Sequence, residues 1–597
     1  MAILKAPRRL PRLLVFVAVT CIIFTYFLLD RIPQRHGKWR TRTLYVPSSF
    51  DWAKRRQTHP LFESDMTRLP EGPPHELPRI QHDFSLDTPS KAHNQTQRRR
   101  RDAVRSTAQK CWATYREYAW GYDELRPQTL SGLDTFSGWG ATLVDSLDTL
   151  WIMGLRTEFQ EAVRMVGTID WDNSTGVVCS LFETNIRYLG GLLSAYDLSQ
   201  EKTLIKKAVE LGNMLYAAFD TPNHMPANAF HFERARRGLL VADSREQSAS
   251  VGTLSLEFTR LSQITGDMKF YSVIDRIKSE LERTQSGTKL PGMWPTFVDL
   301  RNGFLTPDSS FTLGAMADSA YEYLSKMYVL LGGLDPTYKK MHTKAMETVR
   351  NHLLFRPMLP DADTADILFP GTVLSNGGKI IDLLPEVQHL GCFTGGMFAL
   401  GGKLFGIDEH VEIGEKLARG CAWAYEAFPT GVMPEVSEIM PCKTPNLKPC
   451  EWNETRWQEE SEDAERFSKG IRAVRAPGYM LRPEAIESIF ILYRITGKED
   501  LLDVAWRMFE SIQRATETKF ANSAIADVQA DGGYTTKIDS MESFWIAETL
   551  KYFYLIFSDP ELISLDEYVF NTEAHPFKRP KPGGDDMPGG GEKPMHD

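Results

Sequence analysis

The segments AYDLSQEKTLIKKAVELGNML (195–215), LSQITGDMKFYSVIDRIKSEL (261–281) and LYRITGKEDLLDVAWRMFESI (492–512) share one pattern. Each contains the end of an apolar helix, a short polar turn, and an amphipathic helix with apolar residues at i, i+3 or i+4, and i+7. This helical hairpin recurs at irregular intervals of roughly 60–90 residues, whereas strand signals are sparse and local. Irregular spacing disfavours an open solenoid. The sequence therefore predicts an all-α fold in which helical pairs close into a ring with inserted loops.

Four apolar helices are predicted to begin near a carboxylate: SLFETNIRYLGGLL (180–193), MADSAYEYLSKMY (316–328), RPEAIESIFILYR (482–494) and MESFWIAETLKYF (541–553). One acid at a helix start is ordinary, because the helix dipole stabilises it by ~0.3–1 kcal/mol. Four such starts, spread along most of the chain, indicate that the inner helices of the ring meet at one acidic centre. This pattern favours carboxylate chemistry over a nucleotide or nucleic-acid site.

Glu183 and Arg187 lie at i and i+4 and therefore share a helix face. Their apolar neighbours predict a buried or cleft-lining face, where burial raises the pKa of a carboxyl and an arginine lowers it. The alternative is a surface ion pair worth a few tenths of a kcal/mol. Asp318 and Glu322 repeat the spacing after a glycine-containing entry, and a plain helix-start acid is an equally good interpretation there.

Glu484 follows Pro483, a residue well suited to the first helical turn, and Glu487 lies one turn further on. Glu435 also follows a proline, but in a looser context in which a structural role is the stronger interpretation. Paired carboxylates that can act as acid and base suit the hydrolysis of glycosidic bonds. The sequence contains neither a GxSxG elbow nor a GxxxxGK[ST] loop, so it supports neither a serine hydrolase nor a phosphate-binding enzyme.

The N-terminal region predicts a membrane anchor. Residues 13–29 are uncharged, follow four basic residues and precede no small-residue cleavage site, so an uncleaved signal anchor is favoured over a cleaved signal peptide. Both flanks are basic and do not choose an orientation. Sequons at Asn94, Asn173 and Asn453 give modest support to a lumenal C-terminal side. The predicted organisation is a cytoplasmic tail (1–12), an anchor (13–29), a stem or linker (30–105), a catalytic ring (106–576) and a disordered tail (577–597).

Composition and cysteines agree with this setting. The 597-residue chain is 42% hydrophobic and 25% charged, with a net charge of −9, which is typical of a globular protein and gives no reason to expect a nucleic-acid partner. Cys442 and Cys450 bracket a proline-rich loop and could pair, and Cys392 with Cys421 is a second plausible pair. No CxxC, HExxH or Cys/His cluster indicates zinc or redox chemistry. The pattern indicates an oxidising lumen.

Several long segments, in order, resemble the class I α-1,2-mannosidases, glycoside hydrolase family 47. They are LVDSLDTLWIMG (143–154), LFETNIR (181–187), ADSAYEY (317–323), HLGCF (389–393), MPEV (433–436), LRPEAIES (481–488), MESFWIAETLKY (541–552) and VFNTEAHP (569–576). The resemblance covers roughly residues 106–576. It implies an (α/α)7 barrel, plugged at one end, that hydrolyses α-1,2-linked mannose with inversion and uses bound Ca²⁺.

The resemblance also implies roles for individual residues. Glu183 matches the general acid, acting directly or through water. Glu484 and Asp318 match candidates for the base that activates the attacking water, and Glu435 matches a further acidic position with no firm role.

By the same resemblance, Thr572 is expected to bind Ca²⁺ through its hydroxyl and main-chain oxygens. Waters would complete the coordination sphere, held by Glu487, Glu548 and Glu573. An oxygen-only site with many waters is chemically reasonable for Ca²⁺. The expected sugar contacts are Arg187, His389, Arg482 and Phe544, and Cys392 and Cys421 match the family's disulfide.

Two positions depart from the family pattern. Met316 stands where the endoplasmic-reticulum subgroup often has arginine, which leaves trimming of more than one mannose open. Ser250 stands where members often have an acid, so one carboxylate of the substrate network is missing or supplied elsewhere.

The leading hypothesis is a calcium-dependent α-1,2-mannosidase that trims high-mannose N-glycans. We expect a single-pass type II protein of the endoplasmic reticulum or Golgi membrane with a lumenal catalytic domain. A second hypothesis is a glycan-binding factor of the same fold that acts in glycoprotein degradation with little turnover. A third is a toroidal hydrolase that acts on another polysaccharide. The sequence does not decide the oligomeric state, or whether trimming serves maturation or degradation.

Overall fold

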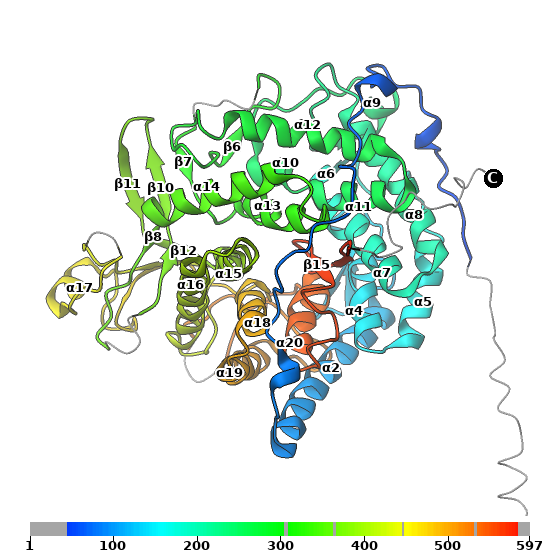
Figure 1. Cartoon of the computed structure of the whole chain (residues 1–597). Helices are drawn as coiled ribbons and strands as arrows, with labels where there is room; N and C mark the ends of the chain where they lie inside the picture. Colours follow the sequence, from blue (N-terminus) through cyan, green and yellow to red (C-terminus); the bar gives the residue numbers. More distant parts are fainter. Residues whose placement is uncertain (1–43, 304–307, 362–365, 445–446, 531–533, 583–597) are drawn as a thin grey trace, which may run out of the picture. The chain divides into compact units, whose positions relative to one another are not determined.

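Pairs of helices build the molecule (Figure 1). The computed structural model describes residues 44–303, 308–361, 366–444, 447–530 and 534–582. The paired helices are α4 (Leu147–Ile152) with α5 (Arg156–Val166), α7 (Gly190–Ser199) with α8 (Lys202–Tyr216), α11 (Ser255–Thr265) with α12 (Met268–Thr284), α13 (Asp318–Leu330) with α14 (Pro336–His352), α15 (Thr394–Phe405) with α16 (Asp408–Glu426), α18 (Glu484–Thr496) with α19 (Asp500–Thr516), and α20 (Leu550–Ile556) with α2 (Lys91–Tyr118).

The first-named helix of each pair belongs to an inner ring. Successive inner helices contact one another in the order α4, α7, α11, α13, α15, α18 and α20. The π-helical segment η8 (Trp545–Thr549), which runs into α20, contacts α4 and closes the ring. Within the described residues, this is the ring of helical pairs that the repeated hairpin pattern predicted.

The sequence of each helix explains its place in the ring. Most residues of the inner helix α18 are buried on every side, whereas its partner α19 alternates buried and exposed residues at helical spacing. A helix that is apolar all round is stable only in a core, and an amphipathic one covers it. Gly395 on α15 permits close contact, because a Cβ there would lie 2.8 Å from the backbone nitrogen of Ala418 on α16.

Short helical segments join the main pairs. They are η1 (Trp52–Lys54), η2 (Glu63–Asp65), η3 (Phe84–Leu86), α3 (Ala141–Asp145), α6 (Leu181–Glu183), η4 (Thr184–Leu189), η5 (Ala217–Phe219), α9 (Phe232–Arg236), α10 (Ser248–Gly252), η6 (Leu390–Phe393) and α17 (Glu454–Glu460). Helix α17 and the Cys442–Cys450 loop pack around a small separate core of Met358, Met440 and Trp457.

All strand pairs are short and antiparallel. They are β1 (Glu124–Arg126) with β2 (Ser131–Leu133), β3 (Val178–Ser180) with β4 (Ala229–His231), β5 (Glu246–Gln247) with β6 (Phe297–Val298), β8 (Leu354–Phe355) with β9 (Phe369–Pro370), β15 (Tyr568–Phe570) with β16 (Pro576–Lys578), and two three-stranded sheets, β11 (Ile380–Leu384)–β10 (Thr372–Ser375)–β7 (Ser310–Phe311) and β12 (Glu386–Gln388)–β13 (Val436–Ile439)–β14 (Ile471–Ala476). Several of them, such as β3 and β12, run directly into segments that lead to the N-terminal ends of inner helices, whereas β15 and β16 follow the C-terminal end of α20.

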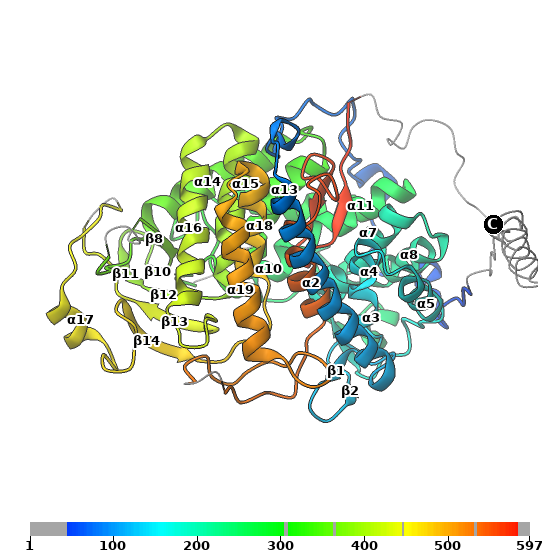
Figure 2. The same ribbon diagram turned by 90° about the horizontal axis from the view of Figure 1, so that it is seen from below.

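Residues 44–90 form an extended segment, here called the N-terminal belt, that first runs along the outer helices α5 and α8 and then crosses the end of the ring where the inner helices α13 and α18 finish (Figures 1 and 2). Belt amides donate to carbonyls at the C-terminal ends of helices: Val46 to Gly167 (2.8 Å), His75 to Gly332 (2.8 Å) and His82 to Arg494 (2.7 Å). The last carbonyls of a helix lack partners within the helix, so these bonds satisfy groups that the ring leaves open.

Two carboxylates from loops of the ring, the buried Asp220 and the partly exposed Asp566, fix the belt as well. Asp220 accepts hydrogen bonds from the backbone amides of Thr58 (2.9 Å) and His59 (2.6 Å) and pairs with the guanidinium of Arg55. Asp566 accepts from the amide of Ile80 at 2.7 Å. The prediction of a linker is therefore wrong for residues 44–105. The belt lacks apolar periodicity because backbone groups, charges and single buried side chains such as Trp52 and Ile80 hold it, without one continuous apolar face.

Two further boundaries differ from the prediction. Helix α2 begins at Lys91, so the basic run 97–102 lies on a helix, and its Arg100 is buried and pairs with Asp503 at 2.6 Å. The predicted disordered tail begins too early, because Phe577 is fully buried in β16 and pairs with Val569. The remainder of that tail, from residue 583, lies outside the described residues.

The predicted anchor at 13–29 also lies outside the described residues. No helix in the part of the chain that the structure describes is long and apolar enough to cross a bilayer. The three sequon asparagines, Asn94, Asn173 and Asn453, are exposed.

Replacing Asp220 tests the belt. Asp220→Ala leaves the buried Arg55 guanidinium and two belt amides unpaired, and we expect it to lower the free energy of unfolding by about 3–5 kcal/mol. Urea denaturation measures this loss. The control is Glu63→Ala, which removes a carboxylate whose side chain is 90% exposed and should change stability by less than about 0.5 kcal/mol. A loss no larger than the control's would show that the belt does not stabilise the ring.

Candidate active site

One cavity of about 350 Å³ collects most of the acidic helix starts. It opens where inner-helix N-terminal ends meet. Its lining includes twelve of the residues singled out from the sequence, namely Glu183, Arg187, Met316, Asp318, Glu322, Arg482, Glu484, Glu487, Phe544, Glu548, Thr572 and Glu573. Glu435 and His389 are not part of this lining, but both contact residues that are. Larger hollows of about 590 and 610 Å³ lie along α16 and contain none of these residues.

Arg187 organises one wall. Ser180 caps α6 by accepting from the amide of Glu183 at 3.2 Å, and the chain then continues as the π-helical η4. Arg187 Nε donates to Glu183 Oε2 at 2.9 Å, and Nη1 donates to Glu573 Oε2 at 2.6 Å. Although burial opposes the charge, Glu573 and Glu183 raise the pKa of Arg187 further above its ordinary value. Widened π turns of this kind are frequent at functional sites.

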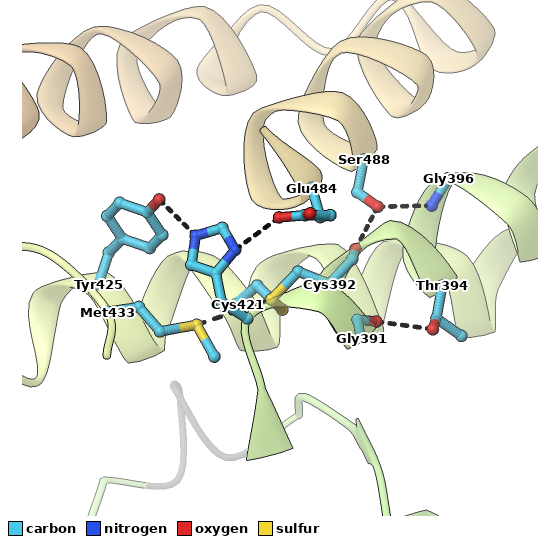
Figure 3. Close-up of a disulfide and its surroundings, with 10 residues drawn as sticks. Gly391, Cys392, Thr394, Gly396, Cys421, Tyr425, Met433, Glu484 and Ser488 are labelled. Carbon is cyan, nitrogen blue, oxygen red and sulfur yellow. Dashed lines mark hydrogen bonds and ion pairs between the residues drawn. A yellow bond between two sulfur atoms is a disulfide. The ribbon is translucent and has the colours of Figure 1, made fainter. Parts of the chain in front are cut away.

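Glu484 occupies the facing wall, as the first residue of α18. Figure 3 shows its carboxylate and the Tyr425 hydroxyl on opposite sides of an imidazole ring, that of His389, whose Nδ1 lies 2.8 Å from Glu484 Oε2 and whose Nε2 lies 2.8 Å from the hydroxyl. Burial opposes ionisation of Glu484, but the hydrogen bond to His389 and the charge of Arg482 lower its pKa. Glu484 is therefore held as a carboxylate.

Asp318 is the first residue of α13 and accepts from the amide of Ser319 at 2.8 Å. Burial raises its pKa to about 7, and the carboxylates of Glu322 and Glu484 add to the shift. Two neighbouring helix-start acids thus differ: the pKa of Glu484 is lowered, whereas that of Asp318 is raised far above the usual range of an aspartate.

Glu435 does not line the cavity itself, but contacts Arg482, which does. It pairs with the guanidinium of Arg482 and accepts from the amide of Met480 at 2.9 Å. Burial opposes the charge on Arg482, but Glu435 and Glu484 raise its pKa above its ordinary value. This geometry gives Glu435 a role in holding Arg482, which agrees with the structural interpretation of its sequence context.

The hairpin of β15 and β16 brings Thr572 and Glu573 to the floor of the cavity. Thr572 Oγ1 donates to Glu322 Oε2 at 2.9 Å. Burial raises the pKa of Glu573 to about 7, although Arg187 opposes the shift. Burial, together with neighbouring carboxylates, also raises the pKa values of Glu487 and Glu548 well above their usual range. Several acids thus crowd around one threonine hydroxyl.

This floor fits a hard divalent cation. Hydroxyl, carbonyl and carboxylate oxygens are the ligands that Ca²⁺ prefers, and a cation would relieve the repulsion among the acids. Within the described residues, no group of three or more His, Cys, Asp or Glu side chains is placed to hold a metal directly. An ion here would therefore rely on Thr572 and on water.

Sequence reasoning missed several buried groups behind the site. Glu257 accepts hydrogen bonds from Asn185 (2.8 Å), Tyr323 (2.7 Å) and Asn571 (2.8 Å), and burial raises its pKa to about 7. Lys326 pairs with Glu322, at the i, i+4 spacing that could have indicated it. The other missed groups come from three distant segments, which contain Asp145 with Asp148, Lys551, and His575, so no local pattern joins them.

Both suggested disulfides form. Cys392–Cys421 joins η6 to α16 beside Glu484 (Figure 3), and Cys442–Cys450 closes the proline-rich loop. The described residues also include two buried free cysteines, Cys111 and Cys179.

Comparison with known proteins assigns the family. The family model described as "Glycosyl hydrolase family 47" matches residues 107–579. The chain belongs to this family. The endoplasmic reticulum mannosyl-oligosaccharide 1,2-alpha-mannosidase of Homo sapiens is 37% identical over 470 residues, which cover 78% of this chain and 62% of the human protein. The mannosyl-oligosaccharide 1,2-alpha-mannosidase MNS1 of Arabidopsis thaliana is 36% identical, covering 81% of this chain and 79% of the plant protein.

A solved structure agrees with the family assignment. The alpha-1,2-mannosidase from Trichoderma reesei superposes with a TM-score of 0.71 at 33% identity, covering 80% of this chain and 98% of that one. This match confirms the mostly helical fold that the sequence predicted for the family 47 region.

The two departures from the family pattern lie near the site. Met316 lines the cavity, is 43% exposed and has a φ of +77°, so an apolar side chain stands at the rim beside Asp318. Ser250 is buried in α10 and hydrogen-bonds to Glu246, which brings a carboxylate next to that position.

The raised pKa of Asp318 predicts how stability depends on pH. The folded chain holds this proton up to about pH 7, whereas an unfolded aspartate releases it near pH 4, so rising pH favours unfolding across this window. Asp318→Asn removes the effect. In the presence of chelator, we expect the melting temperature of the variant minus that of the wild type to increase as the pH rises from 5 to 8.

Asp65→Asn is the matched control, because Asp65 is exposed, and it should show no such gain. A constant difference between Asp318→Asn and the wild type over this range would contradict the raised pKa of Asp318.

Proposed function

We propose that this chain removes terminal α-1,2-linked mannose from the high-mannose N-glycans of glycoproteins. The observation that carries the proposal is the convergence of Glu183, Asp318 and Glu484 on one cavity in a family 47 ring. The names of the human and Arabidopsis relatives and of the Trichoderma protein support cleavage of α-1,2-linked mannose, and the first two name a mannosyl-oligosaccharide as the substrate.

The electrostatics support one residue as the base, and the family pattern supplies the acid. Inverting hydrolysis needs one protonated acid for the leaving oxygen and one carboxylate that takes a proton from the attacking water. Glu484 suits the base, since His389 and Arg482 hold it ionised. Glu183 on the opposite wall takes the role of acid. Asp318, with a pKa of about 7, lies near Glu484 and completes the acidic wall beside it.

The sugar contacts follow from the same walls. The guanidinium of Arg187 lies 5.8 Å and that of Arg482 5.7 Å from the ring centroid of Phe544, so a cationic and aromatic surface borders the cavity. Guanidinium groups donate to hydroxyl oxygens in a fixed geometry, and an aromatic ring packs against the apolar face of a pyranose.

We further propose that Ca²⁺ belongs to this site. Thr572 would hold it with its hydroxyl and carbonyl oxygens, and Glu487, Glu548 and Glu573 would hold its waters. When bound, the ion supplies positive charge that orients sugar hydroxyls and offsets the crowded carboxylates. We also propose a type II membrane protein of the endoplasmic reticulum or Golgi with its catalytic domain in the lumen. The anchor-like sequence and the exposed sequons support this location.

The first test uses detergent-solubilised full-length chain and a labelled nine-mannose N-glycan. We expect free mannose, released first as the β-anomer if the reaction inverts, which proton NMR detects. Glu183→Gln should lower kcat/KM by about 10²–10⁴-fold, because general acid catalysis is lost. Glu459→Gln, an exposed change on α17, should leave it unaltered.

Glycan binding without release of mannose would instead support the degradation factor of the same fold. Release of mannose with normal turnover by Glu183→Gln would remove Glu183 from its role as the acid.

The second test is for the ion. Chelator should abolish turnover and lower the melting temperature, and Ca²⁺ should restore both. At a concentration 100 times its Kd, an ion that binds only the folded chain stabilises it by about 2.7 kcal/mol. Thr572→Val removes the hydroxyl ligand and should abolish the thermal shift with Ca²⁺. If Ca²⁺ raises the melting temperature of Thr572→Val as much as that of the wild type, the ion binds at another site.

A further inference from the structure

A row of buried charges continues from the cavity wall into the core behind Arg187. Its centre is His575, which is fully buried; its Nε2 lies 3.0 Å from Asp145 Oδ1 and its Nδ1 lies 2.8 Å from Asp148 Oδ2. An ionised carboxylate only accepts hydrogen bonds, so both ring nitrogens must carry a proton. Burial opposes the charge, but Asp148 and Asp145 raise the pKa of His575 to about 9. The ring is therefore an imidazolium at neutral pH.

The far end of the row is closed by a second cation. Lys551 Nζ lies 2.9 Å from Asp148 Oδ1 and donates to the carbonyl of Ala574 at 2.6 Å. Asp148 also accepts from the hydroxyl of Ser194 at 2.8 Å. Its charge is thus matched by Lys551 on one side and His575 on the other. All three charged groups are fully buried.

The near end of the row reaches the catalytic wall through Arg187. Asp145 Oδ2 lies 3.8 Å from Arg187 Nη1, too far for a hydrogen bond, and accepts instead from the hydroxyl of Ser543 at 2.5 Å. Arg187 donates to Glu183 and Glu573, and its Nη1 also donates to the hydroxyl of Ser543 at 3.3 Å. Three carboxylates thus surround one guanidinium, which bonds only to the two at the cavity.

We propose that His575 is a positioning residue that acts on Glu183 through Asp145 and Arg187, an inference that rests on the proposed function. The imidazolium neutralises Asp145, so that Arg187 stays bonded to Glu183 and Glu573. Without that charge, Asp145 would be a buried carboxylate without a cation, and the nearest available one is Arg187. The guanidinium would then turn toward Asp145 and release Glu183.

The test is a cycle of full-length His575→Gln, Asp145→Asn and the double variant, each assayed for kcat/KM against pH. Displacement of a bonded group in an active site can cost on the order of 10²-fold, and we expect this loss in His575→Gln. The alkaline limb of its pH profile should also move, because the guanidinium charge has left the cavity. Adding Asp145→Asn removes the competing carboxylate, so the double variant should regain most of the activity and the wild-type limb.

The matched control is His342→Gln, which replaces a fully buried histidine whose ring nitrogens have no hydrogen-bond partner. It should keep the wild-type pH profile whatever its stability. An unfolded single variant that the second substitution restores to activity supports the proposal equally. The proposal is overturned if His575→Gln is active and its alkaline limb lies at the wild-type pH. It is also overturned if the double variant does not regain activity.

A wild-type chain that releases no mannose would contradict the proposed function instead. The crystal structure of His575→Gln would then decide the inference on its own. Arg187 within hydrogen-bond distance of Asp145 and detached from Glu183 would support it, and an unmoved Arg187 would overturn it.

Discussion

The structure depends on charge pairing at the axis of the ring, where many buried carboxylates share a small number of cations. Inner helices that begin with acids bring those acids together, and each ionised carboxylate removed from water needs a partner. Arg187, Arg482, Lys326 and Lys551 supply charge, and His389 supplies a hydrogen bond. Acids that lack a full partner shift toward the protonated form. The resulting spread of pKa values separates groups that can give protons from groups that can take them.

The two ends of the ring expose opposite backbone groups, amides at one end and carbonyls at the other. At the inner-helix N-terminal ends, open amides and helix dipoles favour carboxylates, and there the chain leaves a cavity. At the other end, open carbonyls need donors, and the N-terminal belt supplies them as backbone amides. A belt of irregular sequence suffices for this, because the donors are main-chain groups. The same geometry explains why the belt gives no amphipathic signal and why its sequence predicts a linker.

The hairpin pattern predicted the ring, since each helix carries its own periodicity. The acids Asp318 and Glu484 were found for a similar reason: the helix start is itself a local signal. The roles of Thr572 and Glu573 came only from the family resemblance, because Asn571-Thr572-Glu573 by itself is typical of a surface turn. The structure buries that turn, with Asn571 Oδ1 accepting from the amides of Glu573 and His575, both at 2.9 Å. No local sequence pattern predicts that the β15–β16 hairpin enters the ring of inner helices.

That hairpin links catalysis to the core. Thr572 and Glu573 face the cavity, while the next two residues, Ala574 and His575, are tied to the charges behind it. A shift of the turn by a fraction of an ångström would move the floor of the cavity and the support of Arg187 together. Sites are held most accurately when buried groups fix their supports. Burying the charges of Asp145, Asp148, Lys551 and His575 therefore costs desolvation free energy and adds little net stability. Their effect is to couple the wall and the floor of the cavity, so that the two cannot move independently.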